Sequence, residues 1–189
     1  MRLVLVLILM AAPLQALDFS SRDSFFQVTL SRGWTSLWFT GDIDEPSRVM
    51  EFSAGRGWKL SPFWDLYFTF DGHSFDIEGY GDSYSIGFAS RIRYRNRRFF
   101  AEFGIGPMVN NIPVTWFEYP FKWTPQMRLG LTIVKNKDME ILAHYGLAHY
   151  SHSLISRASN KGYDTHRVGV SVVIPLPDPG ALSFDRSDR

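Results

Sequence analysis

Between Ile141 and Leu176 the chain reads ILAHYGLAHYSHSLISRASNKGYDTHRVGVSVVIPL. Every second residue in its first and last parts is apolar, and successive side chains of a β-strand point to opposite faces of the sheet. The sequence therefore predicts two antiparallel strands joined by a polar loop. The apolar face of the first strand ends in His149 and Ser151. Counting back along the second strand places Asp164 and His166 on its apolar face, beside the same loop.

The beginning of the chain, residues 1–16, has the pattern of a secretory signal peptide. It holds Arg2 close to its start, then an apolar run, and no acidic residue. The run is shorter than the about 20 apolar residues that a spanning helix needs, so we interpret it as a cleaved leader and not as an anchor. No later apolar run is long enough for a spanning helix. A mature protein in a membrane would therefore cross it as a barrel of strands.

The composition argues against two classes of function. The chain has no cysteine, which excludes disulfides and thiolate sites. Its formal net charge is +1, and loss of Arg2 with the leader would leave the mature chain neutral. Such a balance gives no reason to expect a nucleic-acid partner.

About eight segments between residues 17 and 176 alternate in the same way, each near the roughly 9–11 residues of a tilted membrane strand. One face of these segments is apolar, and the other carries charges of both signs, which a dry soluble core would not tolerate unpaired. These charges are Glu51, Asp65, Arg91, Arg93, Glu102, Arg128 and Glu140. The connections alternate between short turns, at 95–98 and 135–138, and long segments. The long segments are 33–47, 71–83, 110–123 and 152–163.

Short turns at one rim and long loops at the other are typical of outer-membrane barrels. We therefore predict an all-β fold, an eight-stranded antiparallel transmembrane β-barrel over residues 17–176, followed by a polar tail at 177–189. Side chains fill the interior of a barrel of this size. The structural alternative is a soluble, lipocalin-like binding barrel of eight strands.

This topology places His149 and Ser151 at the outer rim, on the lipid-facing side, with Asp164 on the adjacent strand. A serine hydroxyl becomes a nucleophile when a histidine accepts its proton, and a carboxylate orients the imidazole. The three residue types thus predict a serine esterase site at the depth of outer-leaflet acyl esters. The simpler interpretation is an interfacial histidine next to a loop serine, although polar groups that face lipid usually have a functional reason.

At these residues the chain resembles the outer-membrane lipid A 3-O-deacylases, a family of acyloxyacyl hydrolases. The family's His-Tyr-Ser-Asn motif matches His-Tyr-Ser-His at 149–152, and its acidic residue on the last strand matches Asp164. Its Ile-Pro-Leu ending matches residues 174–176, and FFAEFGIG at 99–106 is similar to its fifth strand. His152 replaces the motif asparagine, Leu154 stands where glycine is usual, and Asp164 replaces a glutamate.

The resemblance implies hydrolysis of the ester-linked 3-position acyl chain of lipid A, in the outer membrane of a Gram-negative bacterium and without a cofactor. It implies Ser151 as nucleophile, His149 as base and Asp164 as orienting acid. It also assigns Asn160, and the altered position His152, to the binding of the oxyanion. Two other functions stay open, namely a non-catalytic barrel that binds lipid and a hydrolase of other outer-leaflet acyl esters.

The remaining polar residues suggest no second site. We expect His144 to face the interior as part of a buried polar network. His73 is expected in a loop, without an evident partner. The acidic residues of the same region are expected to be solvated and to bind no metal. They are Asp71, Asp76, Glu78 and Asp82.

Overall fold

The computed structural model describes residues 23–36, 47–77, 81–111, 121–151 and 163–177. The leader at 1–16 and nearly all of the tail at 177–189 lie outside these ranges. The described strands are β1 (Ser24–Ser36), β2 (Ser47–Lys59), β3 (Trp64–Ile77), β4 (Gly81–Asn96), β5 (Phe99–Ile105), β6 (Pro107–Asn110), β7 (Phe121–Trp123), β8 (Gln126–Lys135), β9 (Glu140–Tyr150) and β10 (Tyr163–Pro175).

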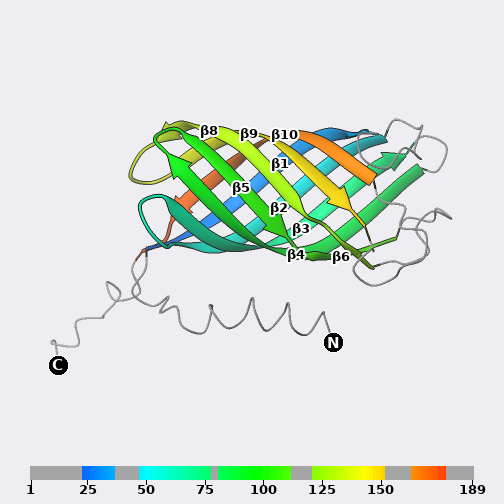
Figure 1. Ribbon diagram of the computed structural model, residues 1–189, viewed down its shortest axis with the longest axis horizontal. Helices are drawn as coiled ribbons and strands as arrows, with labels where there is room; N and C mark the ends of the chain where they lie inside the picture. The colour runs from blue at the N-terminus through cyan, green and yellow to red at the C-terminus, as the bar shows by residue number, and fades with distance from the viewer. Residues whose placement is uncertain (1–22, 37–46, 78–80, 112–120, 152–162, 178–189) are drawn as a thin grey trace, which may run out of the picture.

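These strands form one closed antiparallel barrel (Figure 1). Each strand pairs with the next in the order β3-β2-β1-β10-β9-β8-β5-β4, and pairing of β3 with β4 closes the ring. β6 continues β5 after a break at Gly106, and β7 precedes β8 across a break at 124–125. The predicted eight-stranded antiparallel β-barrel is therefore confirmed.

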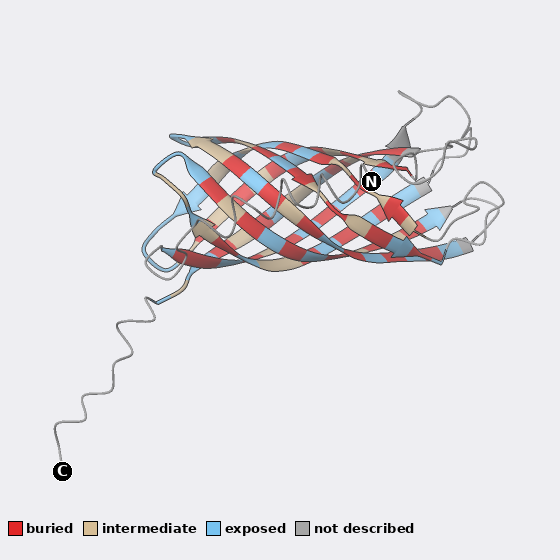
Figure 2. Cartoon of the chain, turned by 60° about the horizontal axis from the view of Figure 1, so that its bottom comes forward, coloured by how far each residue is buried: buried red, intermediate tan, exposed pale blue. Residues whose placement is uncertain are grey.

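Burial alternates along the strands of the barrel, as Figure 2 shows. Large apolar side chains stay exposed on the outer face, for example Phe88 at 66% and Ile133 at 60%. Such a continuous apolar band would be costly in water but suits the hydrocarbon of a bilayer. The alternating pattern in the sequence therefore reports the lipid-facing side correctly. Among the described residues, no helix has the length and apolar character needed to span a membrane.

The interior is an ion-pair network built around two glutamates. Glu51 accepts a hydrogen bond from Arg128 and lies 2.8 Å from Nη1 of Arg167. Glu102 lies 3.0 Å from Nη1 of Arg128 and 3.4 Å from Nη1 of Arg91. All seven charges predicted for the inner face are buried. They are tolerated because opposite charges from different strands meet inside the barrel.

Glycine gives the interior arginines room. Gly146 is the register partner of Arg128 on one side and of Arg167 on the other. A Cβ at Gly146 would lie 3.2 Å from Cγ of Arg128. At Gly33, which is opposite Arg167 on β1, a Cβ would lie 2.6 Å from Cγ of Arg167 and 1.9 Å from the carbonyl oxygen of His166. The absence of side chains here lets the guanidinium groups cross to Glu51.

The predicted loop at 71–83 is wrong. β3 continues to Ile77 and β4 begins at Gly81, so Asp71 and His73 are strand residues whose side chains are buried in the barrel. The apolar alternation stops at Phe70, because the outward positions that follow are small or polar. These positions are Gly72, Ser74 and Asp76. His144 lies inside as predicted, with Nε2 3.1 Å from Oγ of Ser31.

Removing the charge of Glu51 is expected to destabilise the barrel strongly. Glu51→Gln keeps the side-chain shape but leaves Arg167 without its carboxylate and Arg128 with only Glu102. Breaking a buried pair costs about 3–5 kcal/mol. The measurement is the free energy of unfolding of the refolded protein in detergent, followed by tryptophan fluorescence in denaturant. The matched control is Asp23→Asn, which removes an exposed ion pair to Lys59 and should cost at most about 1 kcal/mol. Equal losses in the two variants would contradict the assignment of Glu51 as the centre of the network.

Candidate active site

His149 and Asp164 lie opposite each other on β9 and β10, as register partners of the antiparallel pair. His149 Nδ1 lies 2.7 Å from Asp164 Oδ1. An ionised carboxylate only accepts hydrogen bonds, so Nδ1 carries the proton and donates it. Nε2 is then the basic nitrogen of the ring. The His149 side chain is 30% exposed, whereas that of Asp164 is 8% exposed. The carboxylate is thus held inside the rim, and the imidazole reaches the surface.

Ser151 follows at the end of β9, on the same face as His149. Its N–H donates to the carbonyl of Trp123 at 3.0 Å, and the N–H of Trp123 donates to the carbonyl of Ser151 at 2.7 Å. The N–H of His149 donates to the carbonyl of Pro125 at 3.0 Å. Main-chain bonds on one side fix the backbone of both residues, and the pairing with β10 on the other side also holds that of His149.

Tyr150, between the two, points the opposite way and is fully buried in the barrel. Its hydroxyl lies 2.6 Å from Nδ1 of His73, and its ring packs edge to face on His73 and Phe75, with centroids 5.5 Å apart in both pairs. His73 Nε2 lies 3.8 Å from Oε1 of Glu51. The motif at the rim is therefore anchored to the interior ion pairs. Sequence reasoning missed this link, because His73 was expected in a loop.

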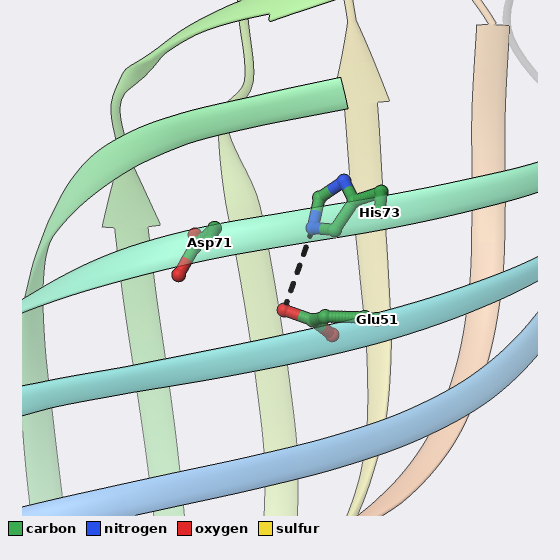
Figure 3. A group of neighbouring side chains, drawn as sticks. All are labelled: Glu51, Asp71 and His73. Atoms are coloured by element: carbon green, nitrogen blue, oxygen red, sulfur yellow. Dashed lines mark ion pairs between the residues drawn. The ribbon is translucent and has the colours of Figure 1, made fainter. Parts of the chain in front are cut away.

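Figure 3 shows the polar group to which His73 belongs, formed by Glu51 from β2 with Asp71 and His73 from β3. Atoms suited to metal ligation in the three residues lie within 4.8 Å of one another. Arginines already supply the positive charge here, since Arg91 Nη2 is 2.5 Å from Asp71 Oδ2 and Arg128 donates to Glu51. We therefore interpret the group as part of the ion-pair network.

His166, one outward position deeper than Asp164, has other partners. Its Nδ1 forms a short hydrogen bond with the hydroxyl of Tyr145. Its ring stacks on that of Trp34, with centroids 5.9 Å apart and planes 10° apart. The structure thus brings Asp164, and not His166, to the imidazole of His149. The proposed oxyanion residues Asn160 and His152 lie outside the described residues.

The outer surface on one side of the site is apolar. On the β8 and β5 side the exposed outward residues are apolar, with Met127, Leu129 and Phe103 each about half exposed. A face of this kind suits an acyl chain. The site therefore combines a histidine–carboxylate pair and a serine with an apolar surface at the rim of a barrel.

Comparisons with known proteins identify a family and similar barrel folds. A family model described as lipid A 3-O-deacylase (PagL) matches residues 45–173. The crystal structure of the outer membrane enzyme PagL is similar, with a TM-score of 0.54 at 17% sequence identity, over 79% of this chain and 99% of that one. The crystal structure of Neisserial surface protein A is also similar, with a TM-score of 0.51 at 12% identity, over 81% of this chain and 97% of that one.

No curated protein matches the sequence significantly. At such low identities the two solved structures support the barrel fold, and the family assignment rests on the family model. Because that model matches more than half of the chain, the chain belongs to the lipid A 3-O-deacylase family, a family of carboxylic ester hydrolases.

Proposed function

We propose that this outer-membrane lipid A deacylase is a serine esterase that removes the 3-position acyl chain, with Ser151, His149 and Asp164 as its catalytic residues. The observation that carries the proposal is the 2.7 Å contact between His149 Nδ1 and Asp164 Oδ1, at the rim and two residues from Ser151. The carboxylate holds the tautomer in which Nε2 can accept the serine proton.

The reaction would proceed in two steps. His149 Nε2 takes the proton of Ser151 Oγ while Oγ attacks the ester carbonyl, and the same proton is then given to the leaving sugar 3-oxygen. His149 next takes a proton from water while the water oxygen attacks the acyl-serine. His149 then returns this proton to Ser151 Oγ as the acyl–oxygen bond breaks and the fatty acid is released. The negative oxygen formed in both steps needs donors. We assign this role to Asn160 and to the residue at the altered position, His152.

Aspartate can serve where the family has glutamate, because Asp164 is the direct register partner of His149. Side chains of directly opposed residues are close enough for a short carboxylate to reach the ring. The shorter side chain of Asp164 is therefore compatible with a working His149–Asp164 pair. The replacement of glutamate by aspartate does not by itself indicate a loss of activity.

The apolar outer band and the family assignment agree with the predicted location in the outer membrane of a Gram-negative bacterium. In such barrels the rim with the longer loops faces outward, which puts His149 in the outer leaflet. The substrate of this leaflet is lipid A itself, so no carrier or soluble partner is needed.

Mass spectrometry of lipid A from cells with and without the protein tests the proposal. Expression should lower the mass of lipid A, because a hydrogen replaces one hydroxyacyl group on the 3-position oxygen. Unchanged lipid A with deacylated phospholipids would instead indicate a hydrolase of other outer-leaflet esters. If neither lipid changes, the barrel is non-catalytic.

A further inference from the structure

Two arginines stand on the outer face of the barrel near the candidate site. Arg32 on β1 and Arg48 on β2 are both exposed. Arg32 lies between two outward apolar residues, Leu30 and Trp34, which are 56% and 50% exposed. A charged residue on the lipid-facing side of a barrel is destabilising at depth and usually has a functional reason. Neither guanidinium forms an ion pair within the described parts of the chain.

Register connects these arginines to the site. His166, the next outward residue below Asp164, is paired with Trp34, and Trp34 is paired on its other side with Arg48. Arg32, two residues from Trp34, is the partner of Val168 on β10. Neighbouring strands lie about 4.8 Å apart, so Arg48 is about 10 Å from His166 across the surface. Because barrel strands are tilted, the step from β10 to β2 also leads toward the outer rim.

The two sides of His149 thus differ in character. Toward β8 the exposed surface is apolar, whereas toward β1 and β2 Trp34, Arg32 and Arg48 add an aromatic ring and two cations to apolar residues such as Leu30 and Met50. Trp34 already stacks flat on His166, and a guanidinium forms two parallel hydrogen bonds to a phosphate. Lipid A has the matching asymmetry, with acyl chains on one side and a phosphorylated sugar headgroup on the other.

We propose that Arg32 and Arg48, together with Trp34, form a binding site for a phosphate group of the lipid A headgroup. This inference rests on the proposed function, because it orients that substrate across the site. With the phosphate at β1 and β2, the scissile ester lies over His149 and its acyl chain lies along β8 and β5. The phosphate also supplies the charge that offsets the cost of Arg32 on the lipid-facing side.

Arg56 provides a matched control. It also lies on β2, it is outward and exposed, and it is eight residues nearer the short-turn end than Arg48. Its guanidinium lies 5.5 Å from the ring centroid of Trp58, and it donates to Ser24 at 3.4 Å. At about 3.3 Å per residue it is on the order of 26 Å from Arg48, outside the reach of a headgroup at the site.

The test measures binding of lipid A to the full chain in neutral detergent micelles, by titration calorimetry. It is done in the Ser151→Ala background, so that no turnover occurs. Adding Arg32→Gln or Arg48→Gln should each weaken binding of bisphosphorylated lipid A by about tenfold, as expected for loss of a charge-assisted hydrogen bond. Adding Arg56→Gln should leave the affinity unchanged. With fully dephosphorylated lipid A, the Arg32→Gln and Arg48→Gln variants should bind with the same affinity as the Ser151→Ala protein.

Two results would overturn the inference. One is an affinity for phosphorylated lipid A that neither Arg32→Gln nor Arg48→Gln lowers. The other is an equal loss for phosphatidylglycerol, which would indicate a general phospholipid contact. Because binding is measured without turnover, both results are separate from a failure of the proposed deacylation, which would appear as unchanged lipid A in cells that express the unmodified protein.

Discussion

Replacing Ser151 by alanine is expected to abolish removal of the 3-linked acyl chain of lipid A. The substitution removes the nucleophilic oxygen, and neither water nor another side chain replaces it in the first step. The barrel should stay folded, because the hydrogen bonds of Ser151 with Trp123 are made by main-chain atoms that alanine retains. The measurement is lipid A composition by mass spectrometry, with heat-modifiable migration on gels as the check of folding.

His149→Ala should lose activity to the same degree. Because nucleophile and base act as one unit, the double variant should be little worse than either single variant. A matched control is His144→Ala, which alters an interior histidine of the same strand. Its side chain contacts Ser31 and not the rim, so activity should persist in the folded fraction. Full activity of Ser151→Ala would assign the chemistry to another residue.

Asp164→Asn is expected to lower turnover by at least about a hundredfold. The amide keeps the size of the side chain but removes the charge that stabilises the imidazolium. It can also turn its NH₂ group toward Nδ1 of His149, which favours the tautomer with the proton on Nε2. Loss of a well-placed triad acid costs about ten-thousandfold in turnover. The effect here should be smaller, since His149 is partly exposed and water can assist it. Turnover in detergent micelles, with the fraction of folded barrel measured in parallel, checks this expectation.

Two further substitutions show whether the carboxylate or the neighbouring histidine acts on His149. Asp164→Glu should keep or raise activity, because it retains the charge and restores the longer side chain of the family. His166→Ala should matter less than Asp164→Asn, because the ring of His166 contacts Tyr145 and Trp34. Wild-type turnover in both Asp164 variants, together with an inactive His166→Ala, would transfer the role of third residue to His166.

The sequence by itself determined the barrel, its inner and outer faces, and the placement of His149, Ser151 and Asp164 on one face at one rim. These features depend on a period of two along each strand, and this period is visible locally wherever one face meets lipid. The contact of His149 with Asp164 could be expected too, because the two residues flank one loop between adjacent strands.

Only the tertiary structure decided the rest. The alternation of apolar residues stops between the apolar band and the long-loop rim, because outward positions there need no apolar side chain. The sequence therefore predicts a loop where the end of β3, with His73, is a strand. The partners of Glu51 and Tyr150, and the position of Arg48 relative to the site, depend on register between strands far apart in sequence. Closure of the ring sets that register, and no local pattern contains it, because each strand alone fixes only which face its side chains share.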